Sequence, residues 1–83
     1  MAHTRAKLCL DTVADANAFV KEINSDGSTE KWMLENFEGN YRVSARSLLG
    51  VIYAVTEWSG EIYLVDETQE EREFPSFIDK YRA

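Results

Sequence analysis

Hydrophobic and polar residues alternate in four short runs of the chain, which is the pattern that a β-strand with one buried face produces. The four predicted strands cover residues 5–10, 31–37, 41–43 and 61–65. Ala6, Leu8 and Leu10 mark the inward side of the first run. The residues at 38–40, Glu-Gly-Asn, are typical of a tight turn, so the second and third strands are predicted to form a hairpin.

Apolar residues recur at helical spacing in three other segments. The predicted helices cover residues 13–24, residues 45–55 and a final segment that begins near Phe74. Thr12 precedes the first helix and Asp15 follows three residues later, which is the pattern of a capping box. Ser44 and Ser47 stand at the start of the second helix, and one of them is expected to be its N-cap. Pro75 is compatible only with a first turn.

The predicted element order is β-α-β-β-α-β-α, and this alternation favours an α+β fold with a four-stranded antiparallel sheet and helices on one face. A length of 83 residues leaves room for one hydrophobic core, so a single domain is expected over residues 1–83. The hydrophobic fraction of 45% is ordinary for a globular protein and argues against intrinsic disorder.

The charge of the chain narrows the range of partners. A net charge of −6 repels phosphate backbones, so no nucleic-acid partner is expected. Five of the eight residues 66–73 are acidic; we interpret this run as a solvated approach to the final helix, and an acidic docking strip is the alternative. Neither a signal peptide nor a membrane-spanning run is recognisable, so no membrane association and a cytoplasmic location are expected.

Few residues have the chemistry of catalysis or of cofactor binding. Cys9 and His3, the single cysteine and histidine, cannot supply a tetrahedral zinc site, so no metal or cofactor is expected. Cys9 is expected to be an inert, partly buried thiol. Glu35, Glu38 and Glu57 are interpreted as dispersed surface charges. Most of five further aromatic residues are expected in the core or at its edge; the five are Trp32, Trp58, Tyr41, Tyr53 and Tyr63.

Residues 43–52, Val-Ser-Ala-Arg-Ser-Leu-Leu-Gly-Val-Ile, resemble the second-helix segment of HPr, the histidine-containing phosphocarrier protein of the bacterial sugar phosphotransferase system. In that family a strand ends, a basic residue precedes a regulatory serine, and a hydrophobic pair and a glycine follow. The resemblance places Ser47 at the regulatory serine and Arg46 at the preceding basic residue. It implies the HPr-like open-faced sandwich fold, with which the predicted element order agrees.

The chain departs from this family at the active centre between the first strand and the first helix. The family has a glycine, a histidine, an arginine and a proline there, whereas this chain has Thr12 at the place of the histidine and Asp15 at that of the proline. A phosphoryl carrier needs a nitrogen nucleophile, because a threonine phosphate ester is far more inert. Asp15 would also repel a phosphate. These residues therefore do not support phosphocarrier activity, and no enzymatic activity is expected.

The combined expectation is a regulatory or protein-docking domain that lacks histidine phosphotransfer and is switched by phosphorylation of Ser47. By resemblance, its partners are the HPr serine kinase and a transcriptional regulator or metabolic enzyme, contacted through Arg46, Leu48, Leu49 and Ile52. The side chain of Arg46 is expected to be exposed. Two alternatives stay open. One is a phosphocarrier of the sugar phosphotransferase system, for which either the first loop aligns differently or His3 serves; the other is an unrelated acidic protein-interaction domain.

Overall fold

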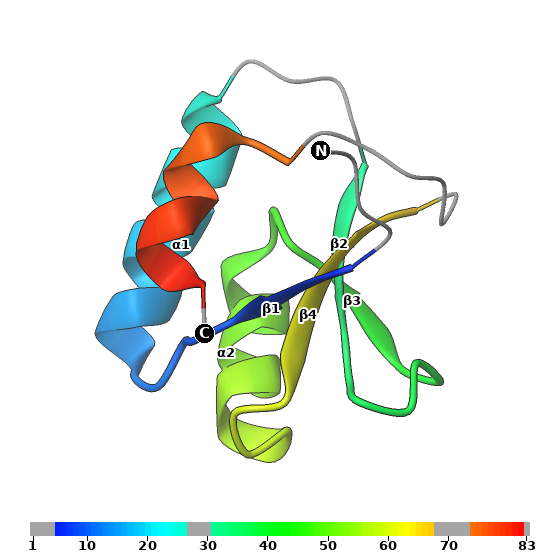
Figure 1. Ribbon diagram of the computed structural model, residues 1–83. Helices are drawn as coiled ribbons and strands as arrows, with labels where there is room; N and C mark the ends of the chain where they lie inside the picture. Colours follow the sequence, from blue (N-terminus) through cyan, green and yellow to red (C-terminus); the bar gives the residue numbers. More distant parts are fainter. Residues whose placement is uncertain (1–4, 27–30, 68–73, 83) are drawn as a thin grey trace.

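The computed structural model describes residues 5–26, 31–67 and 74–82, and Figure 1 shows an α+β fold with a four-stranded antiparallel sheet. The elements in chain order are β1 (Ala6–Leu8), α1 (Val13–Ser25), β2 (Trp32–Glu35), β3 (Arg42–Ser44), α2 (Leu48–Glu57), β4 (Ile62–Asp66) and the 3-10 helix η1 (Ser76–Tyr81). The predicted α+β class and the four antiparallel strands are confirmed.

The strands lie in the order β1-β4-β2-β3, and each neighbouring pair is antiparallel. β2 and β3 form the hairpin that the sequence predicts, with Leu34 opposite Val43. β4 lies between β1 and β2, where Leu64 is paired with Ala6 on one side and with Leu34 on the other. The outer edge of β1 is partly covered by the end of the chain, because Leu8 forms an isolated antiparallel bridge with Arg82.

The hydrophobic core lies between one face of the sheet and the helical elements, all of which are on the same side of the sheet in Figure 1. The sheet residues that belong to this core alternate as predicted; they are Ala6, Leu8, Trp32, Leu34, Ile62 and Leu64. Phe19 of α1, Val51 of α2 and Ile78 of η1 are buried in the same cluster. Burial of a large apolar side chain contributes about 1.5–3 kcal/mol, so this layer supplies the main stabilisation of the fold.

The second helix begins later than predicted. α2 starts at Leu48 instead of Ala45, because Ala45 is fully buried in the turn from β3 and Ser47 takes the N-cap position. A Cβ built on Gly50 would lie 3.1 Å from the Cβ of Val43, so the absence of a side chain lets the first turn of α2 approach β3 closely. This approach positions the Ser47 end of α2 beside the sheet.

The final helix differs from prediction in type. It is a 3-10 helix rather than an α-helix, and it begins at Ser76 with Pro75 as its N-cap residue. Its predicted apolar face nevertheless reaches the core, since Phe77 and Tyr81 pack around Phe19 at ring-centroid distances of 6.0 and 5.6 Å. In the part of the chain that the structure describes, no helix combines the length and the apolar character that crossing a bilayer requires.

Two sequence expectations concern residues outside the described ranges. His3 lies before the first described residue. Residues 68–73 of the acidic run fall between β4 and η1 and are likewise outside these ranges. The interpretations of His3 and of that run stay predictions.

Candidate functional site

Ser47 is the N-cap of α2, and its side chain is exposed at the surface. Its hydroxyl oxygen accepts a hydrogen bond of 3.3 Å from the backbone N–H of Gly50. The first turn of α2 contains no acidic residue, so no carboxylate of that turn offsets the positive end of the helix dipole. The first backbone N–H groups of a helix have no intrahelical acceptor. This end of α2 therefore has the donors and the field that favour a phosphate group.

The apolar residues that follow Ser47 divide between the surface and the core. Leu49 is 81% exposed and Leu48 is 36% exposed, whereas Ile52 is half-buried and packs against the core. Leu49 and Tyr53 are one helical turn apart, and Tyr53 is also exposed. Of the three predicted apolar contact residues, Leu48 and Leu49 are thus accessible, and Ile52 is largely engaged within the fold.

Arg46 joins the start of α2 to the end of α1. Its Nη1 donates to the carbonyl oxygen of Ile23 at 2.9 Å and to the Oδ1 of Asn24 at 3.5 Å, and the Nδ2 of Asn24 donates to the Arg46 carbonyl. A cation is favourable at this place because the last carbonyls of a helix lack intrahelical donors. Arg46 is half-buried, so the expectation that its side chain is exposed is wrong.

Thr12 caps α1, and the predicted capping box is confirmed. The Thr12 hydroxyl accepts a hydrogen bond from the Asp15 N–H at 3.1 Å, and the Asp15 carboxylate accepts one from the Thr12 N–H at 3.2 Å. The same carboxylate accepts a second hydrogen bond, from the Asp11 N–H at 3.0 Å. The Asp15 carboxylate therefore occupies two backbone donors beside this helix start, and its charge repels an anion there.

Cys9 is exposed, so the expectation of a partly buried thiol is wrong. Its thiol donates a hydrogen bond of 3.5 Å to the Asp11 carboxylate, and this bond, together with the charge of Asp11, raises the pKa of Cys9. Because the thiolate is the reactive form, the raised pKa makes Cys9 a poor nucleophile.

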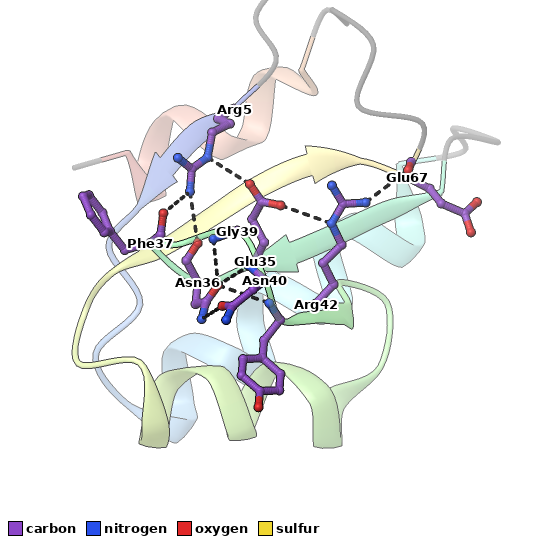
Figure 2. Close-up of polar contacts among 9 residues, drawn as sticks. Arg5, Glu35, Asn36, Phe37, Gly39, Asn40, Arg42 and Glu67 are labelled. Atoms are coloured by element: carbon purple, nitrogen blue, oxygen red, sulfur yellow. Dashed lines mark hydrogen bonds and ion pairs between the residues drawn. The ribbon is translucent and has the colours of Figure 1, made fainter.

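The buried carboxylate of Glu35 was missed by sequence reasoning, which assigned it to the surface. Glu35 is only 4% exposed. Figure 2 shows its carboxylate between two guanidinium groups, with 3.0 Å to the Arg5 Nε and 3.1 Å to the Arg42 Nε. The pairing of Glu35 with Arg42 across the predicted hairpin was a usable signal. The approach of Arg5 carried no such signal, because it depends on the placement of β1.

The loop of the hairpin is organised around the side chain of Asn36 (Figure 2). Its Oδ1 accepts hydrogen bonds from the backbone N–H groups of Gly39, Asn40 and Tyr41, at 2.9, 3.1 and 3.3 Å. Its Nδ2 donates to the Oδ1 of Asn40 at 2.8 Å. The Asn36 side chain therefore supplies the acceptor for the backbone N–H groups of the loop, and these bonds fix the direction in which the chain leaves the loop toward β3.

Three of the five aromatic residues named from the sequence lie in the core or are half-buried, and two are exposed. Trp32 is buried, and Trp58 and Tyr63 are half-buried, but Tyr41 and Tyr53 are exposed. The two exposed tyrosines belong to different segments, the end of the hairpin loop and the middle of α2. Both line one cleft, which is described below.

No group of three or more histidine, cysteine, aspartate or glutamate side chains in the described ranges is arranged to hold a metal ion. Comparison with protein-family models, with curated proteins and with solved structures found no match. The resemblance to HPr therefore depends on residues 43–52 and on the order of the elements.

Proposed function

We propose that the chain is a regulatory, protein-docking domain with an HPr-like open-faced sandwich fold, and that it acts through the start of α2. The observation that carries this proposal is the exposure of Leu49, 81%, two residues after the exposed cap Ser47. A leucine exposed to this degree stabilises the free domain little, whereas burial against a partner would contribute favourably to binding. The order of the elements and the helices on one face of the sheet support the fold assignment.

The contacts of Thr12 and Asp15 support the absence of histidine phosphotransfer. At the start of α1, where the family's phosphorylated histidine would lie, the Asp15 carboxylate already accepts hydrogen bonds from two backbone N–H groups. A phosphate there would have to displace this carboxylate and would be repelled by its charge. The start of α2 has no carboxylate in its first turn, so the two helix starts differ in their capacity for a phosphate.

Ser47 is the proposed switch. A kinase would transfer the γ-phosphoryl group of ATP to the Ser47 Oγ, releasing ADP and the hydroxyl proton. The phosphate adds about 1.5–2 negative charges beside Leu48 and Leu49, where the helix dipole stabilises it. A partner that buries these leucines would then meet a charged group at the edge of its contact. By resemblance, that partner is a transcriptional regulator or a metabolic enzyme.

Intact mass after incubation with ATP and the HPr serine kinase tests the switch. We expect one phosphoryl adduct on the wild type and none on Ser47→Ala. Ser44→Ala is the matched control, since Ser44 is exposed three residues earlier and should leave the adduct unchanged. An unmodified wild type would count against a Ser47 switch.

A second incubation, with phosphoenolpyruvate and the first enzyme of the phosphotransferase system, distinguishes docking from phosphotransfer. We expect no adduct. An acid-labile adduct would contradict the proposal and favour the phosphocarrier alternative with His3 as the nucleophile. The absence of an adduct in both incubations would favour an unrelated acidic interaction domain.

A further inference from the structure

An open cleft of about 430 Å³ lies between the β2–β3 loop and the C-terminal half of α2. Figure 1 shows this loop and the turn from α2 to β4 at the same, lower end of the molecule. The cleft is lined by Asn36, Phe37, Glu38, Tyr41, Tyr53, Glu57, Trp58, Ser59 and Glu61. Its volume falls in the range of sites that bind small molecules or single side chains with their flanking groups.

Aromatic rings form much of this cleft. Phe37 is 60% exposed and Tyr41 is 62% exposed, although both are large apolar side chains. Tyr53 and Trp58 meet edge to face, with ring centroids 6.1 Å apart and ring planes at 89°. Tyr53 is itself 49% exposed, so part of its ring is accessible to a ligand. The fold therefore keeps four aromatic side chains around one solvent-accessible space.

The charge in the cleft has a single sign. Three of the nine lining residues are glutamates, and none of the nine carries a positive charge. Glu61 is engaged, since it lies 3.7 Å from the Lys7 Nζ and accepts a hydrogen bond of 2.9 Å from the Tyr63 hydroxyl. Among the described residues, Glu38 and Glu57 form no ion pair. Two uncompensated carboxylates beside open ring faces attract a cation and repel an anion.

The same region already binds a guanidinium group of the chain itself. The Arg5 guanidinium carbon lies 3.9 Å from the ring centroid of Tyr63, and its Nη2 donates to the carbonyl oxygens of Asn36 and Phe37. Figure 2 shows Arg5 reaching these two carbonyls from the sheet side. The β2–β3 loop thus supplies backbone acceptors, and Tyr63 of β4 supplies a ring face, for a planar, charged group.

We propose that the cleft binds an arginine side chain presented by a basic, extended segment of a partner protein. Arginine suits it better than lysine, because a guanidinium stacks on aromatic rings and donates to carboxylates at the same time. The open shape favours a peptide segment, whose backbone can continue past the cleft on both sides. This surface differs from the start of α2, and the proposal does not depend on modification of Ser47.

Titration of the full 83-residue chain with the blocked peptide Gly-Arg-Gly-Arg-Gly, followed by NMR, tests the proposal. The chain has two tryptophans, so the indole N–H signal of Trp58 should move while that of buried Trp32 stays in place. The matched peptide with glutamine in place of arginine should bind at least about tenfold more weakly. Added salt should weaken binding of the arginine peptide, because both partners are charged.

Substitutions in the cleft and outside it complete the test. Glu57→Gln and Tyr53→Ala should each weaken binding by roughly threefold to tenfold. Leu48→Ser, on the proposed docking surface of α2, should leave the affinity for the peptide within about twofold, so that the two proposals can fail separately. Equal binding of the two peptides, or an unchanged affinity in Glu57→Gln, would overturn the proposal. Tighter binding of tetramethylammonium than of the arginine peptide would overturn the peptide assignment.

Discussion

The phenol of Tyr81 donates a hydrogen bond of 2.6 Å to the carboxylate of Glu22, which also accepts one from Lys80. These bonds tie η1 to α1 across 59 positions of the chain. Burial, together with the hydrogen bond to Glu22 and its charge, raises the pKa of Tyr81 to about 12. The hydrogen bonds from Lys80 and Tyr81 lower the pKa of Glu22. The contact is therefore sensitive to pH on both the alkaline and the acidic side.

On the alkaline side, we expect stability to fall as Tyr81 ionises. Its pKa is raised above the ordinary value of 10.0, so its contribution is complete below pH 10.0 and is lost as the pH rises toward about 12. Tyr81→Phe should lower the free energy of unfolding by about 1 kcal/mol at neutral pH and should reduce the alkaline loss. Urea denaturation across the alkaline range measures both. If Tyr81→Phe loses as much stability at alkaline pH as the wild type, another ionisable group causes the loss.

On the acidic side, we expect stability to fall as Glu22 becomes protonated, because the pKa of Glu22 is lowered in the folded state. Its contribution is complete above the ordinary value of 4.5 and is lost as the pH falls through the lower pKa of the folded state. Glu22→Gln should therefore destabilise the protein at neutral pH and flatten the acid limb of the stability curve. Thermal unfolding of the two proteins at several acidic pH values checks this, and parallel curves would contradict it.

Removal of the Glu35 carboxylate should be costly, because Arg5 and Arg42 would keep their charges without a counter-ion. We expect Glu35→Ala to lower the free energy of unfolding by about 3 kcal/mol. Glu38→Ala is the control in the adjoining loop: Glu38 is exposed, so its loss should change stability by about 0.5 kcal/mol or less. Chemical denaturation measures the free energy of unfolding of both variants. Similar losses in the two would show that the buried carboxylate stabilises the fold no more than the exposed one.

Two replacements of Thr12 test its role as the N-cap of α1 and the proposed absence of histidine phosphotransfer. Thr12→Ala should lower the free energy of unfolding by about 1 kcal/mol, because the N-cap hydrogen bond to the Asp15 N–H is lost. Thr12→His should remain unmodified by phosphoenolpyruvate and the first enzyme of the phosphotransferase system, since Asp15 still occupies the backbone donors. A phosphoryl adduct on this single variant, measured by intact mass, would contradict that account.

Ser59 has a backbone φ of 50°, in the left-handed region, where the turn from α2 leads into β4. Ser59→Gly should raise the free energy of unfolding by about 0.5–1 kcal/mol, because glycine adopts this conformation without the Cβ clash. Ser25→Gly, in the last position of α1, should instead destabilise the protein. Thermal unfolding distinguishes the two signs, and a destabilised Ser59→Gly would show that the serine side chain outweighs the strain.

Local sequence patterns were sufficient to predict those features that depend on a single physical rule. Alternation placed Ala6, Leu8 and Leu10 on the buried side of the first strand, and the spacing of Thr12 and Asp15 predicted the capping box that the structure contains. Both patterns depend only on near neighbours in the chain. The cap of α2 was predicted only as a choice between two serines, and the close approach of α2 to the sheet at Gly50 decided it.

The misses come from contacts between distant segments. Arg46 is half-buried because the end of α1, 23 residues earlier, supplies an acceptor for its guanidinium. Glu35 is buried because Arg42 of the neighbouring β3 and Arg5, which directly precedes β1, neutralise it, and the approach of Arg5 depends on where β1 lies in the sheet. Such positions depend on the assembled fold.

The bridge between Leu8 and Arg82 also bears on how copies of this chain meet. A sheet grows between molecules when an outer strand offers a long row of unpaired backbone groups. Here the last residues of the chain occupy part of the β1 edge, and the opposite edge is β3, only three residues long. Its first residue is an arginine already bonded inward to Glu35. Few unpaired backbone groups are therefore left at either edge for a strand of another molecule to pair with, even at high concentration.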